Sequence, residues 1–187
     1  MIDFDDQRLK EVQRDSQVAL YPAFLRLQGR LCTVIGGGKV ALRKVESLLV
    51  SKALVRVISP VAEDRLLELA NRGIITYEKR CYQAGDAASG YVVIAATNNQ
   101  NVNRQIAMEA DQCGRLVNVV DDPERCSFQV PASFTLGDVG VAISTNGKDP
   151  MAAKHLKNIL MQDLIEEKND FQREVRQWIT NNNQGIF

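Results

Sequence analysis

The sequence contains 187 residues, and its 23 basic and 23 acidic side chains give a formal net charge of zero. The balanced charge argues against nucleic acid as the main partner, and 45% hydrophobic residues is an ordinary value for a globular protein. Apolar runs such as residues 91–96 are far shorter than the roughly 20 residues needed to cross a bilayer, so no membrane partner is expected. Residues 1–6 are acidic where a signal peptide is basic and then apolar, which favours a cytoplasmic protein.

We predict four regions along the chain. Residues 1–19 form a polar extension, as a short surface helix or a partly disordered segment. Residues 20–122 form a nucleotide-binding Rossmann domain, residues 123–149 a dimerisation region, and residues 150–187 a helical tail. This length is typical of one nucleotide-binding domain with smaller additions.

A glycine-rich turn follows the first apolar strand, residues 31–35. Gly36, Gly38 and Ala41 fit the dinucleotide fingerprint G-x-G-x-x-A, and a helical pattern over residues 39–51 follows directly. The start of such a helix offers free N–H groups and about half a positive charge to phosphates. A plain glycine turn is the alternative, but a second strand at residues 54–58 favours nucleotide binding.

Strands and helices then alternate. We predict helices at 62–71 and from 97 to about 114, and strands at 74–77, 91–96 and 116–120. This alternation is typical of an α/β fold with a doubly wound parallel sheet, which binds ligands at the carboxyl ends of its strands. Four segments should therefore meet at one edge of the sheet: Gly36 to Gly38, Ser59 with Pro60, Thr97 with Asn98, and Asp121 with Asp122.

The pattern changes after residue 123. We predict two antiparallel strands at residues 127–134 and 139–145, with a turn at Gly137 and Asp138. The unpaired edges of these strands suggest a homodimer. A helix is predicted from Pro150, capped by Asp149, to about residue 178. Its apolar stripe contains Leu156, Ile159, Leu160 and Leu164. Residues 21–27, interrupted by a proline, are predicted to be an edge segment that leads into the first strand.

The second strand lacks the acidic residue that usually binds the adenosine ribose. It ends in Ile58, Ser59 and Pro60, and Arg56 is its only cation, so the choice between NAD and NADP stays open. Either Ser59 and nearby backbone groups bind the ribose, or Ser59 and Pro60 simply form a turn.

Asp121 and Asp122 follow the fifth strand. Asp-Asp-Pro is common in turns, but a carboxylate at this edge can also remove a proton while a cofactor accepts a hydride. His155, the only histidine, is either incidental or handles protons or a metal.

Other polar groups have simple interpretations. The cysteines are widely spaced, so buried free thiols are favoured over a disulfide or zinc site, and no cluster of metal ligands is expected. Several cations either form a solvated surface or attract a polyanion. They are Lys39, Arg43, Arg104, Arg125 and Lys148.

Six motifs occur in order and together resemble the precorrin-2 dehydrogenase family, which includes the dehydrogenase/ferrochelatase module of sirohaem synthase. They are Y-P-x-F-L-x-L-x-G-R at 21–30, G-G-G-K-V-A-x-R-K at 36–44, A-A-T-N at 95–98, N-V-V-D at 118–121, F-x-V-P at 128–131 and V-A-I-S-T-N-G at 141–147. The resemblance covers about residues 20–165 and leaves the N-terminal extension unassigned.

The resemblance implies a homodimer that uses NAD to oxidise precorrin-2 to sirohydrochlorin, and some members also insert ferrous iron. It makes Asp121 the general base. It places cofactor contacts on Gly36, Gly37, Gly38, Lys39, Val40, Ser59, Pro60 and Val61, to which the sheet edge adds Thr97 and Asn98. It places substrate contacts on Asn118, Ser144, Thr145, Asn146 and Gly147.

Two alternatives stay open. A non-enzymatic dinucleotide-sensing module also uses a dimeric Rossmann unit, but such modules usually keep the acid that this second strand lacks. An oxidoreductase for another substrate leaves the later motifs unexplained. The chain ends soon after the helical tail, so we expect uroporphyrinogen methylation to be done by another protein. No residue separates an iron-inserting member from a dehydrogenase, and we favour the dehydrogenase alone.

Overall fold

The computed structural model describes residues 20–166, 173–174 and 177. The predicted extension at residues 1–19 and the tail helix near residue 178 lie outside the described residues.

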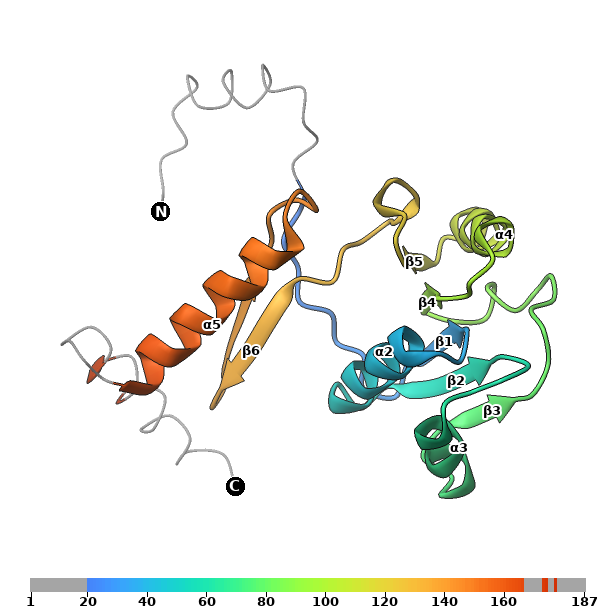
Figure 1. The fold of residues 1–187 in the computed structure, drawn as a ribbon, viewed down its shortest axis with the longest axis horizontal. Coiled ribbons are helices and arrows are strands. Elements are labelled where there is room, and N and C mark those ends of the chain that lie inside the picture. Colours follow the sequence, from blue (N-terminus) through green and yellow to red (C-terminus); the bar gives the residue numbers. More distant parts are fainter. Residues whose placement is uncertain (1–19, 167–172, 175–176, 178–187) are drawn as a thin grey trace, which may run out of the picture.

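A five-stranded parallel sheet forms the first part of the fold, in the order β3-β2-β1-β4-β5 (Figure 1). Its strands are β1 (Leu31–Ile35), β2 (Leu54–Ile58), β3 (Thr76–Glu78), β4 (Val92–Ala95) and β5 (Leu116–Val119). The helices that alternate with them are α2 (Lys39–Val50), α3 (Asp64–Asn71) and α4 (Gln100–Gln112). The predicted doubly wound α/β fold is confirmed.

The sheet is covered on both faces. Ala41, Val45 and Leu48 of α2, with Leu66 and Leu69 of α3, pack in one buried cluster. Ile106, Ala107 and Ala110 of α4 pack in a second cluster, on the side chains of opposite pleat. All of β4 is buried, which explains its continuous apolar sequence.

A small α/β unit follows the sheet. Strands β6 (Ala132–Leu136) and β7 (Val139–Ile143) form an antiparallel hairpin that pairs Ala132 with Ile143, and the turn contains Gly137 at φ +56°. Helix α5 (Pro150–Glu166) lies along this hairpin, to one side of the parallel sheet (Figure 1).

Helix α5 buries less of its apolar surface than predicted. Ala153 is its buried contact, whereas Leu156, Ile159 and Leu160 of the predicted stripe are 46%, 42% and 43% exposed. The chain as described therefore leaves an apolar face of α5 uncovered.

Two smaller predictions were wrong. Residues 21–27 form no strand, and the ring of Phe24 lies against Gly140 of the hairpin. Cys32 is buried as expected, but Cys81 and Cys113 are exposed free thiols because they lie in connections that the core does not cover. No helix among the described residues is both long and apolar enough to span a membrane.

Candidate functional site

Each of the three positions after β1 is occupied by glycine for a different structural reason. Gly36 has φ +127°, and a Cβ there would lie 2.2 Å from the carbonyl oxygen of Ala96. A Cβ on Gly37 would lie 2.2 Å from the carbonyl oxygen of Val61. Gly38 caps the start of α2 and has open space around it. Packing thus requires the first two glycines, whereas the third leaves backbone N–H groups open to an approaching anion.

A large crevice of about 790 Å³ opens beside this turn. Its walls come from the glycine turn, the β2–α3 connection, the residues after β4, and Cys81 with Tyr82. Ser59, Pro60, Val61, Thr97 and Asn98 all line it, so the structure brings these predicted cofactor residues together. The charged residues in its lining are Glu63 and Asp64, and no cation is among them.

Two polar side chains, Arg56 in β2 and Ser59 directly after it, make hydrogen bonds that stabilise the fold. The hydroxyl of Ser59 donates to the carbonyl of Val61 at 2.6 Å, which shapes the turn. The guanidinium of Arg56 donates to the carbonyl of Asp86 and to the hydroxyl of Ser89, both at 2.8 Å. Arg56 is therefore bound to the β3–β4 connection, and it does not line the large crevice.

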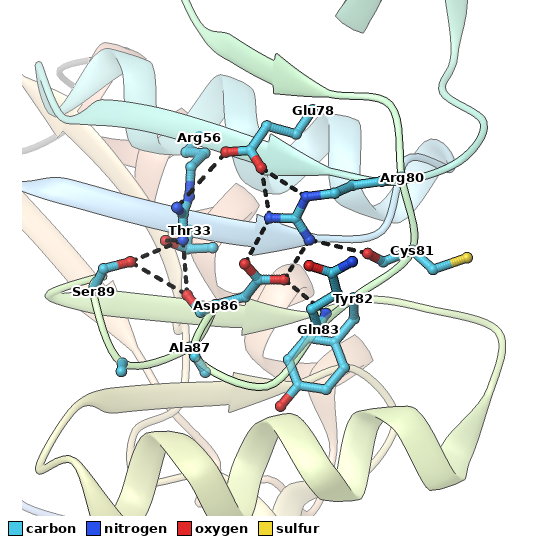
Figure 2. A network of polar contacts seen from close by, with 12 residues as sticks. Thr33, Arg56, Glu78, Arg80, Cys81, Tyr82, Gln83, Asp86, Ala87 and Ser89 are labelled. Carbon is cyan, nitrogen blue, oxygen red and sulfur yellow. Dashed lines mark hydrogen bonds and ion pairs between the residues drawn. The ribbon is translucent and has the colours of Figure 1, made fainter.

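The β3–β4 connection is held by an ion-pair network (Figure 2). Both terminal nitrogens of Arg80 donate to the two carboxylate oxygens of Asp86, each at 2.7 Å. Its Nε donates to Glu78 at 2.9 Å. The backbone N–H of Gln83 also donates to Asp86, at 2.8 Å. The hydrogen bonds from Arg80 lower the pKa of the Asp86 carboxyl below its usual range.

Helix α4 holds the same connection from the other side. One carboxylate oxygen of Glu109 accepts from the N–H groups of Gly85, Ala87 and Ala88 at 2.9, 3.1 and 3.1 Å, and the other accepts from the Tyr82 hydroxyl. Burial, together with this hydrogen bond, raises the pKa of Tyr82. The wall formed by Cys81 and Tyr82 is thus fixed to both sheet and helix. Sequence reasoning missed these residues, because residues 78–90 have no periodic pattern.

A second crevice of about 380 Å³ is lined by Asp121, Lys39 and Val40, among others, and we call it the Asp121 crevice. Gly38, Thr97 and Asn98 line both crevices, so the two adjoin at the start of α2. This is the edge that the sequence predicted for these segments.

The two adjacent aspartates differ in the partners of their carboxylates. Asp122 pairs with Arg125 at 3.2 Å. Asp121 is exposed, has φ +62°, and no hydrogen bond or ion pair engages its carboxylate within the described chain. The Cys126 thiol helps to hold this turn by contacts with Val119 and the Asp122 carbonyl. A strained backbone that presents a free carboxylate is typical of a functional site.

Asn103, which the sequence did not single out, orders the connection after β4. Its side chain accepts from the backbone N–H and the hydroxyl of Thr97 at 3.2 and 2.7 Å, and donates to the Thr97 carbonyl at 3.0 Å. Asn98 is left exposed where the two crevices meet.

The predicted substrate residues do not share one cavity. Asn118 is buried, and its amide donates to the Phe128 carbonyl at 3.2 Å, so it lines neither crevice and connects β5 to the segment leading to β6. Ser144, Thr145 and Gly147 line a separate cavity against α2 and α5, and Asn146 lies at φ +54° in the same turn. Asn118 is thus engaged by the fold and lines none of the three cavities, and its contact with the substrate stays a prediction.

The other candidates are dispersed. His155 is exposed on α5 and lines none of these cavities. Arg104, Arg125 and Lys148, in other parts of the chain, are also exposed and line none of them. Among residues 20–166, 173–174 and 177, no three His, Cys, Asp or Glu side chains are grouped so as to hold a metal ion.

Comparison with known proteins identifies the family. A family described as "Putative NAD(P)-binding" matches residues 23–132. The chain belongs to this family. It is 41% identical over 136 residues to a siroheme synthase of Methylococcus capsulatus and 40% identical over 136 residues to one of Nitrosococcus oceani. Each match covers 73% of this chain and 29% of the relative. The chain thus matches less than a third of the length of these relatives.

A solved structure described as "SirC, precorrin-2 dehydrogenase" is similar over the whole fold. It has a TM-score of 0.68 and 26% identity, and the match covers 87% of this chain and 100% of that one. The resemblance to the precorrin-2 dehydrogenase module is confirmed, as is the order of parallel sheet, hairpin and helix.

Proposed function

We propose that this protein oxidises precorrin-2 to sirohydrochlorin with NAD, as a dehydrogenase of sirohaem biosynthesis. One observation carries the proposal: the carboxylate of Asp121, which has no partner among the residues that the structure describes, lies in a crevice that adjoins the glycine turn. The printed names of the relatives and of the solved structure supply the substrate class.

The residues present fit a dinucleotide. The open space at Gly38 and the N–H groups at the start of α2 would bind the pyrophosphate, with Lys39 and Val40 beside it. The β2–α3 connection, including Ser59, Pro60 and Val61, would bind the adenosine half, and Thr97 with Asn98 would line the path toward the nicotinamide.

The reaction removes one hydride and one proton from the substrate. NAD, when bound, supplies the hydride acceptor. Asp121 would accept the proton on a carboxylate oxygen, because this carboxylate has no hydrogen-bond or ion-pair partner among the described residues. Ser144, Thr145, Asn146 and Gly147 are proposed to contact the tetrapyrrole.

The charges of the large crevice favour NAD over NADP. Glu63 and Asp64 line it, and no cation in its lining could pair with a 2′-phosphate. A phosphate there would meet carboxylates of its own sign, which is unfavourable by Coulomb's law.

We further propose that the protein is a homodimer joined through the hairpin and α5. The exposed apolar face of α5 and the unpaired edges of the two-stranded sheet would be covered by a second copy.

The test is anaerobic absorbance of freshly generated precorrin-2 with NAD, for wild type, Asp121→Asn and the exposed control Glu124→Gln. We expect the sirohydrochlorin spectrum with wild type and the control. Asp121→Asn should lose about 10²- to 10⁴-fold in kcat at unchanged NAD affinity. Tight nucleotide binding without turnover by wild type, with either NAD or NADP, would instead indicate a dinucleotide sensor. Addition of ferrous iron to the product measures iron insertion separately.

A further inference from the structure

The charged residues that line the cavity beside Ser144 are all cationic. It has a volume of about 540 Å³ and lies between the second half of α2, the start of β6 and the first turns of α5, and we call it the basic cavity. Its charged lining residues are Arg43 and Lys44 of α2 and Lys154 and Lys157 of α5. No aspartate or glutamate is part of the lining.

These four cations have no anionic partner in the part of the chain that the structure describes. Lys44 is half-buried, and burial lowers the pKa of its ammonium group. Burial of a cation is unfavourable unless it is paired, so an anion bound in this cavity would be stabilised.

Neutral donors surround the same space. Ser47 of α2, Ser133 of β6 and Ser144 after β7 line the cavity. The carboxylate of Asp149, directly before α5, is directed to its own helix, where it accepts from the N–H of Ala152 at 2.8 Å. Hydroxyl and ammonium donors together suit several carboxylate groups better than one compact anion.

Helix α2 connects this cavity to the Asp121 crevice. It contributes Lys39 and Val40 to the crevice, and Arg43, Lys44 and Ser47 to the cavity. Four residues are about one helical turn, or about 6 Å along the axis. A large ligand with its reacting carbon beside Asp121 therefore has acidic side arms within reach of the cavity.

We propose that the basic cavity binds carboxylate side arms of the tetrapyrrole substrate, with Lys44 and Lys157 as the main contacts, one from each wall. The identity of the substrate rests on the proposed function, whereas the preference for a polycarboxylate rests on the cavity itself. These lysines determine substrate affinity and take no part in the proton or hydride transfer.

The test uses uroporphyrin, an eight-carboxylate tetrapyrrole, as a binding probe without nucleotide. Its absorbance and fluorescence are titrated with wild type, Lys44→Met/Lys157→Met, Lys44→Arg, and the exposed control Lys79→Met, all checked for folding by circular dichroism. We expect the double variant to bind at least tenfold more weakly and the other two to bind like wild type. The difference should shrink at high salt. Coproporphyrin, with four carboxylates, should bind more weakly than uroporphyrin, and inorganic phosphate should displace neither at millimolar concentration.

Turnover separates this proposal from the proposed function. With precorrin-2, the double variant should raise KM about tenfold and leave kcat and NAD affinity nearly unchanged, whereas Asp121→Asn should remove turnover and still bind the probe. Normal KM and probe affinity in the double variant would overturn the carboxylate site even if wild type is an active dehydrogenase. If the probe binds through the lysines but wild type shows no turnover, the proposed dehydrogenase activity is overturned and the proposed carboxylate site is supported. Equally tight binding of phosphate would also overturn the polycarboxylate preference.

Discussion

Arg80 and Asp86 face each other across the β3–β4 connection with two parallel hydrogen bonds of 2.7 Å (Figure 2). This fork-to-fork geometry is the strongest arrangement for such a pair, and it includes an almost fully buried carboxylate. Cys81 and Tyr82, which follow Arg80, form a wall of the large crevice. The ion pair therefore both stabilises the β3–β4 connection and holds this wall in place for the proposed nucleotide.

Replacing Asp86 should therefore affect both properties. Asp86→Asn leaves Arg80 with one carboxylate fewer, and we expect a loss of about 2 kcal/mol in the free energy of unfolding. NAD should also bind several-fold more weakly, because Cys81 and Tyr82 lose one of their two anchors, the other being Glu109 of α4. Urea unfolding and fluorescence titration measure the two effects. The exposed Asp111→Asn on α4 is the control, with a change below about 0.5 kcal/mol. Unchanged stability in Asp86→Asn would show that the pair contributes little.

Acidification should weaken the fold through the same residue. Since Arg80 lowers the pKa of Asp86 in the folded protein, the ionised carboxylate stabilises the fold above its unfolded pKa of about 3.9. That stabilisation is lost as pH falls through the lower, folded pKa, where the unfolded chain already binds the proton. The free energy of unfolding should decline below about pH 5, and less steeply in Asp86→Asn. Parallel pH profiles for the two proteins would contradict this assignment.

Gly36 and Gly38 should respond differently to the same substitution. Gly36→Ala places a methyl group 2.2 Å from a backbone oxygen at φ +127°, so we expect a loss of about 4 kcal/mol or a failure to fold. Gly38→Ala meets open space, and it should keep the fold within about 1 kcal/mol. Its methyl group occupies the proposed pyrophosphate position, so NAD affinity should fall at least tenfold. Normal NAD binding by Gly38→Ala would place the cofactor elsewhere. Thermal unfolding and calorimetric titration distinguish these outcomes.

Cofactor preference should depend on the acids of the large crevice. Glu63→Gln/Asp64→Asn removes two negative charges, and each like-charge contact with a 2′-phosphate costs about 1 kcal/mol. NADP affinity should thus rise about 30-fold while NAD affinity changes little. Glu46→Gln, exposed on α2, is the matched control and should change neither. If NADP already binds wild type as tightly as NAD, these acids do not set the preference.

The proposed dimer should depend on α5. Leu156→Glu/Leu160→Glu places charges on its exposed apolar face, and we expect the dissociation constant to rise at least tenfold. Sedimentation equilibrium measures this, with Met108→Glu on α4 as the control because that side chain is also exposed. A wild-type monomer at micromolar concentration would overturn the proposal.

The sequence alone determined the order of strands and helices. Their periodicity, the glycine turn and the Asp149–Pro150 helix start are local signals, because burial of one face repeats along the chain every two or 3.6 residues. It also determined which segments meet at the sheet edge, since parallel strands end together. The position of Asp121 beside the glycine turn therefore follows from the sequence.

Only the tertiary structure decided which polar groups are engaged and which are free. Asp121 and Asp122 are equivalent in sequence, yet only Asp122 has a cationic partner, Arg125, in the described chain. Arg56 and Asn118 looked available to a ligand, but groups 30 and 10 residues away bind them. The basic cavity combines lysines of α2 and α5 from distant parts of the chain. Such pairings depend on how elements pack in three dimensions, and local sequence patterns carry no signal for contacts between residues so far apart.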